Sequence, residues 1–458
     1  MPDYLPHTNE DIAEMLAFLG LRSLDELFEA VPAALRIAGG LGLDAGIPEP
    51  DVLARARGRA DANGARADRL VCFAGAGAYD HEVPPVVRAL AGRSEFVTAY
   101  TPYQPEVAQG GLQAIFEFQT MLSRLFGLPI ANASLYDGAS AVVEAVNLGV
   151  GATGRSGVLV SAGVHPHWRA VLTTFAAGTG HRVLEVPLEG GRTRWDTVAE
   201  ATDIGVVVVG YPNYLGCLED MAAVRALCDE RGALMAVVAD PVAAGVLRSP
   251  GDWGADVAVG EGQPFGTPLS FGGPYLGLFA CSAAHVRRLP GRLVGETLDA
   301  DGRLAYVTTL RAREQDIRRQ KATSNVCTNQ TLMALTAAIQ LGWLGTTGLV
   351  EVATRCARAT RYCRQALSSL PGVEPLSGTT PVVREFALRL ALPGRVVVER
   401  LAEEGFLAGV ALGDLVGEAG DGSLCEDEAT HGLLVAVTER RTRDEIDRFA
   451  AALDKALR

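Results

Sequence analysis

Apolar residues gather in short, valine-rich runs between residues 150 and 280, and polar or glycine-rich stretches separate these runs. The runs are, in chain order, Val158–Val160, Val183–Val186, Gly205–Val209, Ala236–Ala239, Val257–Val259 and Leu276–Phe279. Near-continuous β-branched runs alternating with helical segments are typical of parallel strands that are covered on both faces. The pattern therefore predicts an α/β fold with a large, mostly parallel sheet.

A different period marks the predicted helices, in which apolar residues recur every three or four positions. It indicates helices over residues 112–125, 141–148 and 331–344. Near the C-terminus, strands at residues 385–392 and 432–437 flank a helix at 393–404, and Thr442 caps a last helix that ends near Leu457. These elements predict a second, smaller α/β domain.

The first 60 residues contain two patterns that are typical of helix starts. Thr8-Asn-Glu-Asp11 and Ser23-Leu-Asp-Glu26 both resemble capping boxes, in which each side chain satisfies the backbone N–H of the other residue. We expect a helical arm that packs on the main body or on another subunit. The predicted division is an N-terminal arm (1–65), a large domain (66–325) and a small C-terminal domain (326–458).

The segment between residues 287 and 321 is dense in arginine. Most of these charges are expected on a solvated helix face.

Composition narrows the function classes. The chain has 458 residues, 48% of them hydrophobic, and a formal net charge of -13. A nucleic-acid surface is not expected, because phosphate binding needs clustered cations.

The scattered cysteines form no C-x-x-C pair, so we expect free thiols in a reducing compartment. The N-terminus does not resemble a signal peptide, and no apolar run approaches the ~18 residues of a membrane span. The expected location is the cytoplasm.

Two strand ends carry the first chemical signal. The strand at residues 236–239 ends in Asp240, and the strand at 257–259 leads into a glycine- and proline-rich loop that reaches Pro274. This layout is typical of fold-type I pyridoxal-phosphate (PLP) transferases, which are aspartate aminotransferase-like. Their aspartate holds the pyridinium nitrogen, and a lysine of the loop binds the cofactor. Here the loop has no lysine, and the whole chain has only Lys321 and Lys455.

Other motifs are weaker. Gly75-Ala-Gly77 has Asp80 where a dinucleotide fingerprint needs its third glycine, so NAD binding is not expected. His165-Pro-His167 alone is a poor metal signal, and no metal is expected. Residues 132–140 precede a helix and are compatible with a phosphate cradle or with plain capping by Asp137 or Ser140. The polar loop at residues 96–106 is either a solvated turn or the lining of a cleft.

Several uncommon strings occur together and in one order. They include Gly75-Ala-Gly-Ala-Tyr-Asp-His81, Thr98-Ala-Tyr-Thr-Pro-Tyr-Gln104, Gly260-Glu-Gly-Gln-Pro264, Phe271-Gly-Gly-Pro-Tyr-Leu-Gly277 and Lys321-Ala-Thr-Ser-Asn325. With these strings the chain resembles, nearly end to end, subunit 1 (the α, or N-terminal-half, subunit) of the two-subunit P-protein family of the glycine cleavage system, the decarboxylating glycine dehydrogenases.

The resemblance implies an activity and a set of partners. The family's enzyme uses PLP to decarboxylate glycine, releases CO2 and passes the aminomethyl group to the lipoyl arm of H-protein. Subunits 1 and 2 form a heterotetramer with two copies of each, and only subunit 2 carries the PLP lysine. Counted back from Pro274, the lysine position falls on Gln263 here. An amide nitrogen is delocalised into its carbonyl and cannot act as the nucleophile.

Fold-type I active sites lie at a dimer interface, so the resemblance also implies that this chain completes its partner's site. We expect Thr323, Ser324 and Asn325 to reach the phosphate of the partner's PLP. Tyr100, Thr101 and Tyr103 are second candidates, which would line the cleft near glycine or the lipoyl arm.

Two other functions stay open on the residues alone. The chain could be a scaffold or regulatory subunit that adds nothing to its partner's site, in which case the partner would be active alone. It could also be a self-sufficient PLP enzyme that uses Lys321, in which case borohydride would trap PLP on that residue.

Overall fold

The computed structural model describes residues 6–37, 40–63, 70–97, 104–378, 380–417 and 420–458. The chain forms two units, Met1–Arg66 and Ala67–Arg458. The predicted boundary between a large and a small domain near residue 325 stays a prediction.

The first unit contains the predicted helices, but only one of its two capping boxes forms. Helix α1 (Asn9–Leu19) begins at Thr8, whose hydroxyl accepts the backbone N–H of Asp11 at 3.2 Å while the Asp11 carboxylate accepts that of Thr8 at 2.7 Å. Helix α2 (Glu49–Ala62) follows after 3-10 turns at Leu24–Phe28 and Ala33–Leu35.

The capping box predicted at Ser23 is wrong. Ser23 makes no capping hydrogen bond, and the segment after it is a 3-10 turn. The Glu26 carboxylate instead accepts hydrogen bonds from the backbone N–H and the Nε of Arg22, at 3.2 Å and 2.9 Å. The arginine therefore takes the acceptor that the capping box needed.

The second unit is built on a seven-stranded sheet with the order β2-β10-β9-β8-β7-β3-β4. Its strands are β2 (Ile130–Ala131), β3 (Gly157–Ser161), β4 (Arg182–Val186), β7 (Ile204–Tyr211), β8 (Leu234–Ala239), β9 (Val257–Glu261) and β10 (Gly277–Cys281). Strands β4, β3, β7, β8 and β9 are parallel, and β10 is antiparallel to both of its neighbours. The predicted mostly parallel sheet is confirmed.

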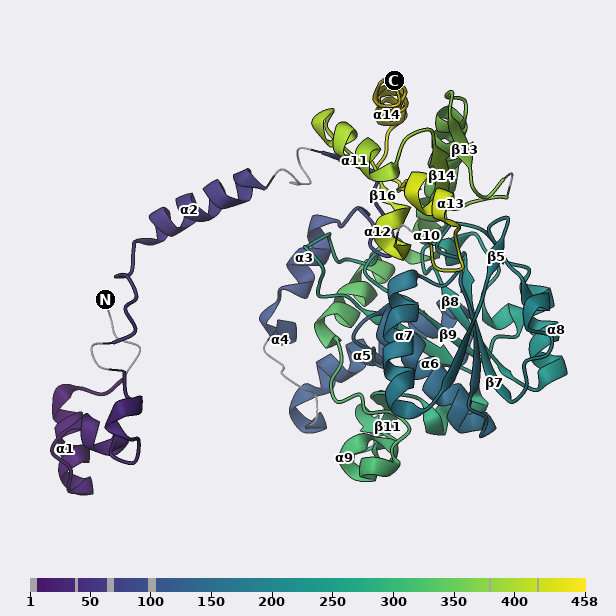
Figure 1. Ribbon diagram of the computed structural model, residues 1–458. Helices are drawn as coiled ribbons and strands as arrows, with labels where there is room; N and C mark the ends of the chain where they lie inside the picture. The colour runs from purple at the N-terminus through teal and green to yellow at the C-terminus, as the bar shows by residue number, and fades with distance from the viewer. Residues whose placement is uncertain (1–5, 38–39, 64–69, 98–103, 379, 418–419) are drawn as a thin grey trace. The chain divides into compact units, whose positions relative to one another are not determined.

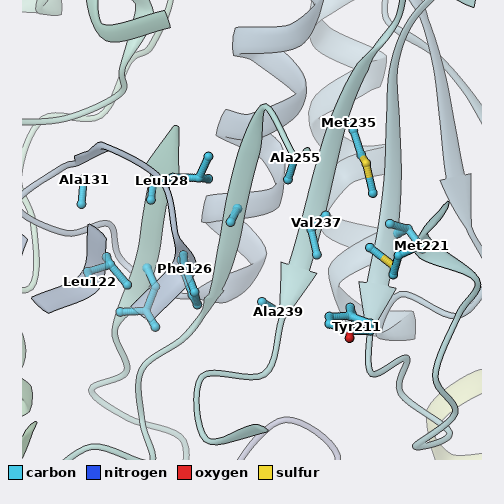
Figure 2. Packing of buried hydrophobic residues seen from close by; sticks show 14 of the residues in the cluster. Leu122, Phe126, Leu128, Ala131, Tyr211, Met221, Met235, Val237, Ala239 and Ala255 are labelled. Atoms are coloured by element: carbon cyan, nitrogen blue, oxygen red, sulfur yellow. The ribbon is translucent and has the colours of Figure 1, made fainter. Parts of the chain in front are cut away.

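Both faces of this sheet are covered (Figure 1). Val207 and Val209 of β7 belong to one core cluster, whereas Val206 and Val208 belong to another, because successive side chains of a strand point to opposite faces. Residues of α5 (Pro105–Phe126), α8 (Met221–Arg231) and α10 (Thr331–Ser368) fill the first cluster, and residues of α6 (Gly138–Thr153) and α7 (Pro166–Thr179) fill the second. Figure 2 shows part of the first cluster, including Phe126.

A four-stranded antiparallel sheet with the order β13-β14-β17-β16 forms the predicted smaller α/β layer. Its strands are β13 (Val373–Pro375), β14 (Glu385–Leu390), β16 (Val410–Ala411) and β17 (Gly432–Ala436). One core cluster joins this sheet to α11 (Gly394–Glu403), to α14 (Arg443–Ala456) and to the last turns of α10. In addition, β1 (Val71–Cys72) pairs in parallel with β15 (Phe406–Leu407), which connects residues 71–72 to the C-terminal part of the chain.

Helix α10 extends beyond the residues 331–344 that the pattern predicted. It kinks at Gly345, whose φ of 60° and ψ of -176° are not helical. By length and composition alone it is apolar enough to cross a membrane. Its residues Ala334–Ala338, however, are buried in the core clusters or close to them, and it packs on α5, α3 (Pro85–Ala91) and α14. This part of α10 therefore belongs to the core.

The arginine-rich segment at 287–321 is not the helix face that its charge pattern suggested. It contains an antiparallel hairpin of β11 (Leu293–Leu298) and β12 (Leu304–Thr309), followed by the short α9 (Gln315–Arg318). The missed signal is the turn between the strands, where the Asp299 carbonyl accepts the N–H of Gly302 at 3.0 Å. An acidic residue and a glycine between two apolar runs favour a hairpin.

The remaining short elements connect these layers. They are α4 (Ser94–Val97), β5 (Leu188–Glu189), β6 (Arg192–Thr193), α12 (Leu412–Val416) and α13 (Glu426–His431).

Burial in the first cluster yields a test of the fold. Phe126 of α5 is fully buried, so Phe126→Ala should lower the free energy of unfolding by about 3–5 kcal/mol through lost contacts and a new cavity. Phe175 of α7 is 53% exposed, and Phe175→Ala should change it by no more than about 0.5 kcal/mol. Urea unfolding of the two variants measures the contrast, and equal losses would contradict the assigned packing.

Candidate functional site

A cleft of about 80 Å³ lies at the carboxyl ends of β7, β8 and β9, the sheet edge at which open α/β folds hold their ligands. Residues from several separate segments line it, among them Tyr79, His165, Trp168, Asp240, Glu261, Arg384 and Glu385. The last two begin strand β14 of the smaller sheet or directly precede it, so both sheets contribute to the cleft.

Asp240 directly follows β8, where the sequence placed it, and its carboxylate is fully engaged. One oxygen, Oδ1, accepts the backbone N–H groups of Val242 at 2.9 Å and Ala243 at 3.2 Å. The other, Oδ2, accepts Nε of Arg384 at 2.6 Å. Both side chains are largely buried, so this ion pair is a desolvated one that depends on both partners.

Arg384 continues into a buried chain of polar groups. Its Nη1 lies 2.6 Å from Nε2 of His81, and Nδ1 of the same ring lies 2.7 Å from the Glu439 carboxylate. A guanidinium N–H can only donate, so Nε2 accepts and Nδ1 carries the proton. With both ring nitrogens used, His81 has none left for a metal ion, although Cys356 and Glu439 lie close enough to it to form a ligand cluster.

Tyr79 joins the same network through its ring and its hydroxyl. The guanidinium carbon of Arg384 lies 3.6 Å from the centre of the Tyr79 ring, which is a close cation–π contact. The hydroxyl donates to Oε2 of Glu385 at 2.8 Å, and the backbone N–H of Ala76 donates to Oε1 at 2.7 Å. Burial raises the pKa of Glu385 to about 7, and these two hydrogen bonds only partly offset the cost of desolvation.

Glu261 ends β9 and reaches the N-terminus of α6. Its Oε2 accepts the N–H of Gly138 at 2.9 Å, while Oε1 accepts those of Gln263 at 2.9 Å and Leu276 at 2.8 Å. Burial raises its pKa to about 7. Another N–H in the first turn of the helix, that of Ser140, is capped by Asp137 at 2.7 Å. Two carboxylates of the chain itself therefore occupy the end of α6 that the sequence left open as a phosphate cradle.

Gln263 stands where the sequence placed it, in the loop after β9, and its amide is held by backbone atoms. Nε2 donates to the carbonyls of Tyr79 at 3.1 Å and Thr267 at 2.7 Å, and Oε1 accepts the N–H of Tyr79 at 2.9 Å. The side chain is buried and tethers the loop to the segment that carries Tyr79. It does not belong to the lining of the cleft among the described residues.

Neither lysine lies at the cleft. Lys321 ends an exposed 3-10 turn, and Lys455 pairs with Glu404 near the end of α14.

The segment after Lys321 alternates between outward and inward side chains. Thr323 and Asn325 are exposed. Between them, Ser324 is partly buried, accepts the N–H of Val326 at 3.2 Å and hydrogen-bonds to the Glu144 carboxyl. The other predicted group, Tyr100, Thr101 and Tyr103, lies outside the described residues.

The two histidines of His165-Pro-His167 lie at the start of α7, where the ring of His165 makes local hydrogen bonds. Nε2 of His165 bonds to the carbonyl of Ala76 at 3.0 Å, and Nδ1 accepts the N–H of His167 at 3.2 Å. Burial lowers the pKa of His165 to about 4, so its ring is neutral near pH 7.

The sequence reasoning missed Arg384, Glu385 and Glu261 as cleft residues. A signal was available for each. Glu261 follows a buried apolar strand as Asp240 does, and the pair Arg384-Glu385 comes just before the apolar run Phe386–Leu388. A charge at the end of a buried strand is worth examining because it lies at the ligand edge or needs a partner.

The sheet order, the helices on both faces and the Asp-ended strand beside a glycine-rich loop define a class of fold. The structure of a sphingosine-1-phosphate lyase from Burkholderia pseudomallei covers 93% of this chain and 94% of its own with a TM-score of 0.64 at 16% identity. The chain thus has the α/β fold of the PLP-dependent fold-type I enzymes, as its sequence predicted.

Closer similarity gives the family. The family model described as "Glycine cleavage system P-protein" matches residues 2–379. A chain of Moorella thermoacetica named "Probable glycine dehydrogenase (decarboxylating) subunit 1" is 47% identical over 98% of both chains. A crystal structure of "glycine decarboxylase (P-protein) of the glycine cleavage system, in inhibitor-bound form" is 45% identical with a TM-score of 0.90, over 99% of this chain and 100% of that one.

The chain therefore belongs to the P-protein family of the glycine cleavage system, among the subunit 1 chains of glycine dehydrogenase (decarboxylating). It is a subunit of an enzyme, and the predicted family, fold and enzyme class are confirmed.

The raised pKa of Glu385 gives a pH-dependent prediction. An unfolded glutamate loses its proton near pH 4.5, whereas folded Glu385 keeps it to about pH 7, so this group makes folding less favourable as pH rises between these values. Glutamine does not titrate, so the penalty is absent from Glu385→Gln. The free energy of unfolding of this variant, relative to that of the native chain, should therefore increase by about 1–3 kcal/mol as the pH rises from 5 to 8. Urea unfolding across this range measures the gain. Glu200→Gln, at an exposed glutamate, is the matched control and should show no such increase. If the difference in unfolding free energy between Glu385→Gln and the native chain stays constant with pH, the assignment is refuted.

Proposed function

We propose that this chain is the subunit of glycine decarboxylase that carries no cofactor lysine. Together with subunit 2, as a heterotetramer with two copies of each, it decarboxylates glycine and releases CO2. PLP is held covalently by the partner and supplies the electron sink for the decarboxylation. The aminomethyl group passes to the lipoyl arm of H-protein. This chain contributes side chains and a scaffold to the partner's site.

The observation that supports the proposal best is that Gln263, at the expected lysine position, has a buried amide held by backbone hydrogen bonds. A cofactor lysine needs a free primary amine that points into the cleft. Gln263 offers an amide that is hydrogen-bonded to Tyr79 and Thr267. Lys321 and Lys455 are both exposed, away from the cleft.

The other residues of this chain's own cleft do not fit PLP either. The Asp240 carboxylate, which would meet a pyridinium N–H, already holds Arg384 and two backbone N–H groups. A phosphate at the N-terminus of α6 would meet the carboxylates of Glu261 and Asp137, which repel an anion and already use two of the available N–H groups. We therefore assign the chain's chemical role to the partner's site.

Thr323 and Asn325 are the best candidates for that role. Their side chains are exposed. Thr323 lines a small surface hollow together with Ser324, Arg287, Arg288 and Arg313, whereas Asn325 does not belong to its lining. Hydroxyl and amide groups next to guanidinium groups suit a phosphate ester, because charge-assisted hydrogen bonds to phosphate are strong. Ser324 was predicted with them, and its partial burial at Glu144 makes it the useful comparison.

The double variant Thr323→Ala/Asn325→Ala tests this assignment in the assembled enzyme. Two lost hydrogen bonds to a charged phosphate should weaken PLP retention by roughly tenfold to a hundredfold. Glycine–bicarbonate exchange should fall at limiting PLP and recover with excess cofactor. PLP release during dialysis, followed by absorbance, provides the measurement.

Ser324→Ala is the matched control and should leave PLP retention within about twofold of the native enzyme. If the double variant also retains PLP and turns over normally, the segment does not reach the cofactor. The chain would then act as a scaffold in that region.

A further inference from the structure

The charges that line the cleft of this chain do not balance. Asp240 and Arg384 neutralise each other through their ion pair. Glu385 and Glu261 also line the cleft, and neither forms an ion pair among the described residues. Burial accordingly raises the pKa of each of these two carboxyls to about 7. A positive charge in the cleft would compensate this cost.

Glu385 has room for a further donor. Each of its oxygens accepts a single hydrogen bond, one from Ala76 N–H and one from the Tyr79 hydroxyl. A carboxylate has about four lone-pair sites in all, so Glu385, which lines the cleft, can accept further hydrogen bonds. Glu261 already accepts three backbone N–H groups and has less to offer.

The walls suit an organic cation better than a metal ion. Trp168 lines the cleft beside Tyr79, whose ring already holds the Arg384 guanidinium, and aromatic faces attract ammonium groups but provide no oxygen ligands. Glu385 and Glu261 together have few free lone pairs, fewer than the six or more oxygen ligands that a hard divalent cation takes. The cleft of about 80 Å³ has room for roughly five water-sized groups.

We propose that this cleft binds a small organic cation with a primary ammonium group, of the size of methylammonium, with the ammonium donating to Glu385 and Trp168 forming part of the wall. The proposal rests on the proposed function in one respect, namely that PLP does not occupy this cleft. It gives this chain a ligand site of its own, separate from the site it shares with subunit 2.

Calorimetric titration of the purified full-length chain, without subunit 2, tests the proposal. Methylammonium chloride should bind saturably with a dissociation constant in the millimolar range. Glycine should bind more weakly, because its carboxylate would lie near Glu385 and Glu261. Tetramethylammonium chloride has the same charge but no N–H donor and more bulk, and sodium acetate has the opposite charge. At equal ionic strength neither should bind. Equal heats for all four compounds, or saturable binding of acetate alone, would overturn the proposal.

A variant pair then locates the ammonium. Glu385→Gln keeps the size of the side chain and an acceptor for Ala76 but removes the charge, so methylammonium affinity should fall at least tenfold. Glu200→Gln makes the same chemical change on the exposed surface and should leave the affinity unchanged. An unchanged affinity in Glu385→Gln would place the ligand elsewhere and refute the site. If Glu385→Gln does not fold, the proposal is judged on the native chain alone, by whether methylammonium binds saturably and acetate does not.

PLP absorbance of the same samples separates the two proposals. A chain that binds neither PLP nor methylammonium contradicts only the inference about the cleft. A chain that retains PLP contradicts the proposed function, whatever the titrations show.

Discussion

The buried ion pair between Asp240 and Arg384 is the constraint on which the rest of the site depends. It joins the end of β8 in the large sheet to the residue just before β14 in the smaller one. Removing either partner would leave an uncompensated buried charge, which typically costs about 3–5 kcal/mol. Through Arg384 the pair also orients the Tyr79 ring and the ring of His81. This interaction thus links the two sheets and helps to orient the groups around the cleft.

The same interaction explains how a fold-type I chain can keep its architecture without cofactor chemistry. Each feature that a cofactor would use is satisfied from within: the aspartate by Arg384, the start of α6 by Glu261 and Asp137, and the lysine position by the tethered amide of Gln263. A buried polar group without a ligand destabilises the fold unless another group of the protein forms a hydrogen bond or ion pair with it. The internal partners remove that destabilisation, which supports the proposal that this chain holds no cofactor of its own.

Much of this could be read from the sequence, and the failures have physical reasons. The parallel strands were predictable because valine-rich runs bounded by glycine favour buried strands. Asp240 was predictable because it directly follows one of those strands, and Gln263 because the family resemblance places the lysine position there. The hairpin of β11 and β12 was missed because the density of arginine outweighed the turn signal at Asp299–Gly302. Arg384 and Glu385 were missed because their partners are distant in sequence, as Tyr79 is from Glu385. Local patterns carry no information on such pairings.

The central claim is that this chain completes a PLP enzyme without holding the cofactor. The most direct measurement is borohydride trapping of PLP, with an absorbance spectrum and glycine–bicarbonate exchange, on this chain alone and after mixing with subunit 2. We predict no bound PLP and no exchange for the chain alone, and both in the mixture. A PLP adduct on Lys321 of the isolated chain, together with exchange activity, would contradict the account.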